Sequence, residues 1–269
     1  MTDSTPILSA SEIKNFQLEN DLIVAFEQHS FQLFYQPIIA IESNEMIGFE
    51  VILKWLNSQD EWIDPPVFLP LAQRLGLIEE LTQWQIEQAC QQLRVWQQQY
   101  PIHTGLTINI NLSIAQFLQP NFIPTLKGIL QATGISPANL SLSIAEISFI
   151  QNHESMFSVI ASLKALGIQC CMADFSISYF TLNILKDLSI DTLKVKCSLL
   201  TNKTWKVSKA ILAIAKKLGL TTIVEEVESL EKVSFLKTLG CNQAQGHFFS
   251  EPVDAETARV FLSTFSLRH

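Results

Sequence analysis

Apolar positions along the chain follow two spacings, one typical of β-strands and one typical of α-helices. The predicted strands span residues 31–37, 45–55, 106–111, 140–145, 168–174, 191–195, 221–226 and 242–246. The predicted helices include residues 11–29, 121–134, 154–167, 179–188, 206–219, 229–240 and 254–265. Repeated strand–helix units with short connections predict a parallel sheet that is covered by helices.

The number of strands decides between an open sheet and a closed one. Eight predicted strands in a chain of 269 residues favour a closed barrel. The connection between the first two strands is too short for a parallel crossover, so these strands should run antiparallel. We therefore predict an α/β fold, a modified TIM (β/α)8 barrel with one antiparallel strand. The barrel is predicted to be a single domain over residues 1–269, with residues 1–30 as an N-terminal helical lead-in.

Composition narrows the class of protein further. Hydrophobic residues make up 48% of the chain and charged residues 16%, which argues against disorder. The formal net charge of −8 argues against a broad contact with nucleic acid or with an anionic membrane. The five cysteines form no CxxC pair, and the N-terminus lacks the pattern of a signal peptide. These features predict a cytoplasmic protein with reduced thiols and with neither a nucleic-acid nor a membrane partner.

Polar residues gather where the predicted strands end, which is where TIM barrels carry their functional sites. They are Glu50, Lys54, Asn111, Glu146, Asp174, Lys194, Glu225, Glu228 and Gln245. A helix cap, a buried ion pair or a rim charge explains each of them singly. Together they suit oxygen-ligated divalent cations and a phosphate group at one barrel mouth.

Seven short motifs connect the chain to a known family. They are YQP, FEVILKW, INLS, ADF, TLKV, VEEVE and AQG, in that order. On these motifs the chain resembles, over roughly residues 15–262, the EAL domain family. That family consists of bacterial phosphodiesterases that hydrolyse cyclic di-GMP, together with inactive relatives.

The resemblance implies a role for each matching residue. Glu50, Asn111 and Asp174 take the positions of metal ligands. Lys194 takes the position of the catalytic lysine, and Glu225 that of the general base. The implied contacts to the nucleotide are Gln36, Lys54, Asn111, Lys194 and Gln245.

The chain departs from the family at two of the implied metal ligands. Ser143 stands where the family has glutamate, and Ala173 where it has aspartate. Other departures are Lys54, Ser176, Ser178, Lys196, Glu226 and Glu251. The family's chemistry uses two divalent ions to activate water, so an incomplete cluster predicts that the chain is not an enzyme. No cofactor is then required, and Mg²⁺ or Mn²⁺ should bind weakly.

Three functions remain open at this stage. The first is a non-catalytic receptor that binds cyclic di-GMP and relays the signal to a protein partner not yet identified. The second is a protein-interaction module that needs no nucleotide. The third is a weak phosphodiesterase with one metal at Glu50, Asn111 and Asp174. A homodimer is compatible with each of them.

Overall fold

The computed structural model describes residues 10–28, 30–101, 104–175, 185, 189–200 and 205–266. The chain divides into two compact units, of which the smaller comprises Met1–Gln32 and Leu53–Leu81. The larger comprises Leu33–Ile52 and Thr82–His269 and carries most of the strands. Residues 1–9 of the predicted lead-in lie outside the described residues, as does most of the predicted helix 179–188. The single domain stays a prediction.

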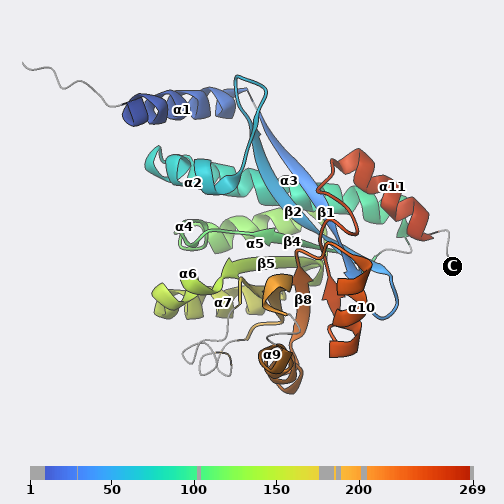
Figure 1. Ribbon diagram of the computed structural model, residues 1–269. Helices are drawn as coiled ribbons and strands as arrows, with labels where there is room; N and C mark the ends of the chain where they lie inside the picture. The colour runs from blue at the N-terminus through green and yellow to red at the C-terminus, as the bar shows by residue number, and fades with distance from the viewer. Residues whose placement is uncertain are drawn as a thin grey trace, which may run out of the picture. The chain divides into compact units, whose positions relative to one another are not determined.

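The strands of the described residues form one sheet that closes on itself (Figure 1). They are β1 (Phe31–Ala40), β2 (Met46–Leu56), β3 (Trp62–Ile63), β4 (Thr107–Asn111), β5 (Leu140–Ala145), β6 (Gln169–Ala173), β7 (Thr192–Lys196), β8 (Thr221–Glu225) and β9 (Gln243–Ala244). Their order is β1-β9-β8-β7-β6-β5-β4-β2-β3, and an additional β1–β2 pairing closes the barrel.

Strand directions agree with the sequence. β1 runs antiparallel to β9, whereas the pairs from β2–β4 round to β8–β9 are parallel. The predicted modified TIM barrel with one antiparallel strand is confirmed. The two-residue strand β3 was not predicted; it pairs antiparallel with Trp55 and Leu56, the last two residues of β2.

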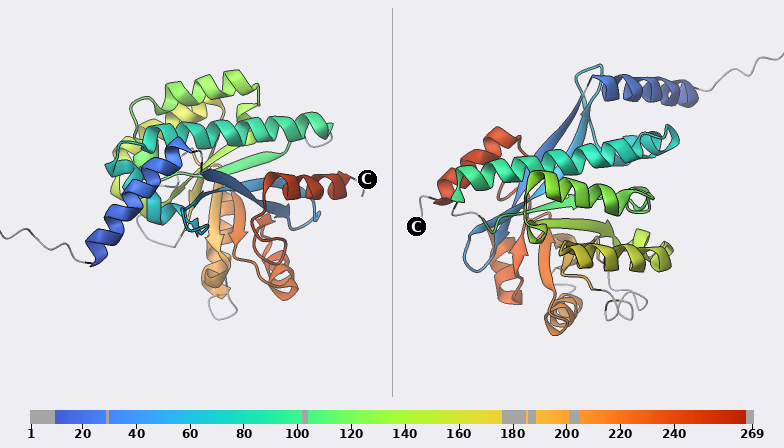
Figure 2. Two further views of the ribbon diagram at one scale, coloured as in Figure 1. Left: turned by 90° about the horizontal axis from the view of Figure 1, so that it is seen from above. Right: turned by 180° about the vertical axis from the view of Figure 1, so that it is seen from behind.

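Helices follow the strands as predicted. In the larger unit they are α3 (Ile78–Gln99, which begins in the smaller unit), α4 (Ile114–Phe117), α5 (Phe122–Thr133), α6 (Glu146–Gln151), α7 (His153–Leu166), α9 (Trp205–Lys217), α10 (Leu230–Leu239) and α11 (Ala255–Ser266). Seen from behind, α5 and α7 lie side by side on the outer face of the strands (Figure 2). None of the helices in the described ranges is long and apolar enough to cross a membrane.

Strand alternation explains why this sheet closes around a polar interior. On β4, Ile108 and Ile110 are fully buried under the helices, whereas Asn109 faces the opposite way. Asn109 donates to Ser141 Oγ and accepts from Ser143 Oγ, both at 2.9 Å. These bonds satisfy polar groups that would otherwise be costly to bury, so the barrel interior tolerates polar side chains.

The smaller unit contains α1 (Ala10–Glu27) and α2 (Pro65–Arg74). The two helices are joined by an ion pair between Arg74 Nη2 and Glu19 Oε1 at 2.6 Å. Beneath them the Phe68 ring contacts the rings of Phe31 and Trp55, at centroid distances of 5.8 and 6.1 Å. An aromatic cluster therefore forms the core of this unit.

A substitution at Gly48 tests the parallel pairing of β2 with β4. A Cβ added at Gly48 would lie 2.4 Å from the carbonyl oxygen of Thr107, the residue that pairs with it. We expect Gly48→Ala to lower the free energy of unfolding by about 1–3 kcal/mol because the strands must separate. In Gly128→Ala the new methyl group meets open space on α5, and the variant should gain about 0.5–1 kcal/mol. Urea unfolding measures both changes, and equal effects would contradict the register.

Candidate functional site

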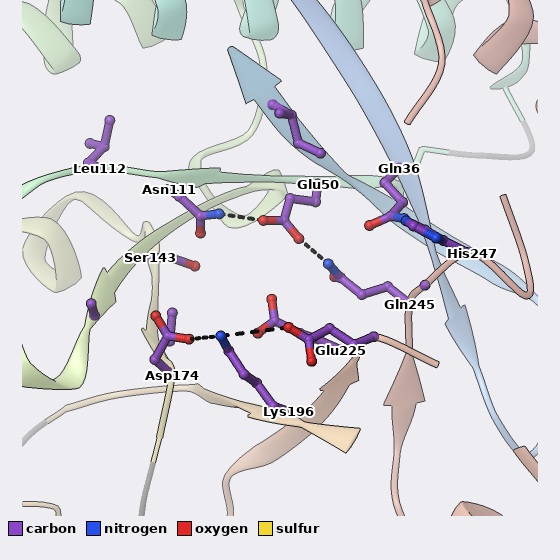
Figure 3. Close-up of a pocket in the computed structure, with 15 residues that line it drawn as sticks. Gln36, Glu50, Asn111, Leu112, Ser143, Asp174, Lys196, Glu225, Gln245 and His247 are labelled. Carbon is purple, nitrogen blue, oxygen red and sulfur yellow. Dashed lines mark hydrogen bonds and ion pairs between the residues drawn. The ribbon is translucent and has the colours of Figure 1, made fainter. Parts of the chain in front are cut away.

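A pocket of about 400 Å³ opens where the barrel strands end (Figure 3). Its wall contains the last residue of each of β4, β5, β6, β7 and β8, together with residues from β1, β2 and the segment after β9. The sequence-predicted residues that it brings together are Gln36, Glu50, Asn111, Ser143, Ala173, Asp174, Glu225 and Gln245. Residues far apart in the sequence therefore share one cavity.

Glu50 on β2 is the centre of the hydrogen bonds in this pocket. Asn111 Nδ2 donates to its Oε1, and Gln245 Nε2 donates to its Oε2. Burial alone would raise the pKa of the Glu50 carboxyl, but the charge of Lys194 and these hydrogen bonds outweigh burial and hold that pKa below its usual range. Glu50 is therefore a fixed, buried anion.

Lys194 on β7 supplies the balancing charge. Its side chain is fully buried, and its Nζ lies 2.9 Å from Glu50 Oε2 and 3.3 Å from Glu225 Oε1. Burial by itself lowers the pKa of Lys194, yet the two carboxylates raise it overall, so the ammonium group stays charged. Burial raises the pKa of the Glu225 carboxyl, and Lys194 opposes this effect only in part.

Lys196 stands two residues further along the same strand, at the pocket mouth. Its Nζ lies 3.3 Å from Asp174 Oδ1 and 3.6 Å from Glu226 Oε1. Sequence reasoning did not select Lys196 as a site residue. The signal was available, because residues i and i+2 of a strand face the same side.

Asp174 and Glu226 hold unusual backbone conformations beside Lys196. Their φ angles are 52° and 61°, in the left-handed region that favours glycine. Asp174 follows the last residue of β6, and Glu226 follows the last residue of β8, the two strands that flank β7. Non-glycine residues in this region cost free energy and tend to occur at functional sites, which supports a function for this mouth.

The remaining predicted residues lie at or near the pocket, with one difference. Gln36 Nε2 donates to the Ser250 carbonyl oxygen at 3.1 Å. Gln245 Oε1 is buried and, within the part of the chain that the structure describes, has no hydrogen-bond partner. Lys54 belongs to the smaller unit, where its Nζ lies 3.6 Å from Asp64 Oδ1, and it is not among the residues that line this pocket.

The donor set can be compared with the needs of a divalent metal ion. Among the described residues, no three His, Cys, Asp or Glu side chains form a group that would hold a metal. Ser143 Oγ donates inward to Asn109, and each pair of carboxylates in the pocket already contacts a lysine. The residues as arranged do not fit a divalent ion.

A parallel barrel with one antiparallel strand, whose strand ends hold acids, amides and lysines around one pocket, belongs to the class of TIM barrels with a site at the carboxyl ends of the strands. The EAL domain model matches residues 19–252. The chain belongs to the EAL domain family.

Relatives of known name include two proteins of Pseudomonas aeruginosa. The chain is 30% identical to the bifunctional diguanylate cyclase/cyclic di-GMP phosphodiesterase MucR over 93% of its own length and 37% of the relative's. It is 26% identical to the cyclic di-GMP phosphodiesterase NbdA, over 94% of its length and 33% of the relative's. The chain thus spans about a third of the length of these relatives.

Solved structures give the same assignment. The cyclic di-GMP complex of the MucR phosphodiesterase has a TM-score of 0.83 and 31% identity, over 90% of this chain and 99% of that one. The EAL enzyme Bd1971 bound to cAMP and cyclic di-GMP has a TM-score of 0.87 and 26% identity, over 94% of this chain and 70% of that one. The P. aeruginosa FimX EAL domain bound to cyclic di-GMP has a TM-score of 0.77 and 25% identity, over 87% of this chain and 95% of that one.

The prediction that this chain is not an enzyme is contradicted by these findings. Similar proteins and structures are named as cyclic di-GMP phosphodiesterases or as an EAL enzyme. The prediction gave decisive weight to Ser143 and Ala173. It gave too little weight to Lys194 and Glu225, which the structure holds in direct contact at the pocket.

The buried contacts of Lys194 can be tested by Lys194→Met. The change leaves Glu50 and Glu225 buried without a cation, so the free energy of unfolding should fall by about 3–5 kcal/mol at pH 8. Without Lys194, burial raises the pKa of both carboxyls above their unfolded values, so stability is lost as pH rises. The deficit should therefore shrink toward pH 5.

Lys164→Met is the matched control for this measurement. Lys164 also forms an ion pair, at 2.6 Å from Asp191 Oδ1, but both side chains are about one-third exposed. Its loss should cost about 1 kcal/mol or less. Equal losses for the two variants in urea unfolding would contradict the account of Lys194.

Proposed function

We propose that this domain is a receptor for cyclic di-GMP, which binds in the pocket at the barrel mouth. The observation that carries the proposal is the buried, unpaired Gln245 Oε1 inside a pocket that also contains an exposed ammonium group. A buried acceptor without a partner is costly, and a ligand that donates a hydrogen bond removes that cost. Guanine and ribose carry such donors, and the phosphates carry the charge that Lys196 favours.

Further observations support the same ligand. A pocket of about 400 Å³ lies within the usual range for small-molecule sites. Structures similar to this chain, those of MucR and FimX, are described as complexes with cyclic di-GMP. Gln36 and Asn111 add amide groups to the wall, and amides suit the hydrogen-bonding edges of guanine.

Relay of the signal to a protein partner is the second part of the proposal. Large apolar side chains are exposed on segments that follow the barrel strands, namely Leu118, Ile147, Leu199, Leu230 and Phe248. Exposed apolar side chains on the same side as a ligand pocket support a contact that senses the pocket. A module that ignores the nucleotide would have no need of the unpaired Gln245 acceptor.

Binding can be measured by calorimetric titration with cyclic di-GMP. Saturable binding is expected, and Gln245→Leu should weaken it about tenfold or more because the ligand loses a buried hydrogen bond. Gln169→Leu is the matched control, since Gln169 begins β6 at the opposite end of the barrel. Absence of heat with the unmodified chain would contradict the receptor.

Hydrolysis of cyclic di-GMP is a second candidate function, favoured by the contact between Lys194 and Glu225. The Glu225 carboxyl lines the pocket, and its raised pKa makes it a stronger base than an ordinary glutamate. A water oxygen would attack phosphorus while Glu225 takes the water proton. The bond from phosphorus to the ribose 3′-oxygen would break, and the released 3′-oxygen would take up a proton from solvent to become a hydroxyl. The product is the linear dinucleotide.

Chromatography of the nucleotide after incubation tests this candidate, with Mg²⁺ or Mn²⁺ supplied in the buffer. Hydrolysis predicts that the linear dinucleotide accumulates with time and that Glu225→Gln lowers the rate at least about a hundredfold. Lys237→Gln, on the far end of α10, serves as a surface control that keeps the rate of the unmodified chain. Unchanged cyclic di-GMP in every reaction would rule out hydrolysis and leave the receptor.

A further inference from the structure

Two lysines of β7 form two layers of positive charge in the barrel. Lys194 is fully buried beneath the pocket, whereas Lys196 is 44% exposed and lines the pocket itself. Figure 3 shows Lys196 reaching across the pocket mouth toward Asp174. Only the outer ammonium group is open to a ligand from solvent.

The contacts of Lys196 leave it free to act on a ligand. Its two partners lie at 3.3 and 3.6 Å, longer than the usual charge-assisted hydrogen bond of about 2.7–2.9 Å. Asp174 and Glu226 are each more than half exposed, so water screens both pairs and each contributes little. An ammonium group has three donors, and a phosphate oxygen can therefore be added or exchanged at small cost.

Lys196 also changes what the mouth can bind. The carboxylates of Asp174 and Glu226 lie on the two sides of β7. A divalent cation bound to their oxygens would be repelled by the positive charge of Lys196. The ammonium group between them supplies that positive charge from the chain itself. It lowers the repulsion that an approaching phosphodiester would otherwise meet from the two carboxylates.

We propose that Lys196 is a built-in counter-ion that takes the place of a divalent cation at the pocket mouth and donates to a phosphate group of the bound dinucleotide. The phosphate contact of Lys196 rests on the proposed function, the binding of cyclic di-GMP. The role of Lys196 as a counter-ion concerns the chain alone. Nucleotide binding then requires no added metal.

The nucleotide half is tested by calorimetry in buffer with a chelator. Lys196→Gln should raise the dissociation constant for cyclic di-GMP about tenfold or more, because one charge-assisted hydrogen bond is lost. Lys237→Gln is the matched control: Lys237 is 50% exposed, pairs with Glu42 Oε2 at 3.7 Å, and does not line the pocket. Thermal unfolding checks that both variants are folded. We expect both to fold because the two lysine side chains are exposed.

The counter-ion half is tested without nucleotide, by titration with MnCl₂. The unmodified chain and Lys237→Gln should show no saturable Mn²⁺ binding. Lys196→Asp should gain it, because three carboxylates would then converge at the ends of neighbouring strands. Saturable Mn²⁺ binding by the unmodified chain, or no saturable Mn²⁺ binding by Lys196→Asp, would show that Lys196 does not act as a counter-ion.

The outcomes separate this inference from the proposed function. If the unmodified chain binds cyclic di-GMP and Lys196→Gln binds it equally well, the phosphate contact is wrong and the receptor stands. If chelator abolishes binding, the replacement of a metal is wrong while the receptor again stands. If no form of the chain binds the nucleotide, the receptor and the phosphate contact fall together, and the Mn²⁺ titration alone decides the counter-ion.

Discussion

The buried ammonium group of Lys194 is the interaction on which the pocket depends. Two carboxylates reach it from β2 and from β8, and its charge lowers the pKa of each carboxyl against the effect of burial. The cost of burying the three charges is met by their mutual attraction and by the amides of Asn111 and Gln245 on Glu50. The same contacts fix the positions of strands that are distant in the sequence, so charge balance and barrel geometry support each other.

Positive charge continues outward from this centre. Lys196 repeats, at the exposed mouth, the arrangement that Lys194 makes inside: one ammonium group between two carboxylates. The difference is burial, and burial decides function. The inner lysine is held by strong contacts in a medium of low polarity, whereas the outer one is loosely held and screened by water. A ligand therefore meets an exposed ammonium group above a buried one.

The sequence predicted the barrel well, because strands repeat with a period of two residues and helices with 3.6. The sequence did not predict β3, because a strand of two residues is too short to show an alternation of apolar and polar positions. Motif positions correctly brought Glu50, Asn111, Glu225 and Gln245 to one pocket. No motif could show how deeply each side chain is buried, so the exposed position of Lys196 at the pocket mouth could not be predicted from the sequence.

The error about enzymatic activity has a similar origin. The prediction of no activity rested on counting the family ligands lost at Ser143 and Ala173. Such a count leaves out how the remaining residues are held, and relatives of this chain are named as phosphodiesterases. Depth, charge balance and contact distances are properties of the fold. They are what the proposed binding mode depends on.

A crystal structure of the chain with cyclic di-GMP, grown with a chelator, would show whether Lys196 takes the place of a metal ion at the phosphate. We predict the dinucleotide at the carboxyl ends of the strands, with one of its phosphate oxygens within about 3 Å of Lys196 Nζ and a donor of the ligand on Gln245 Oε1. Nucleotide bound elsewhere, or a phosphate that makes no contact with Lys196, would contradict this prediction.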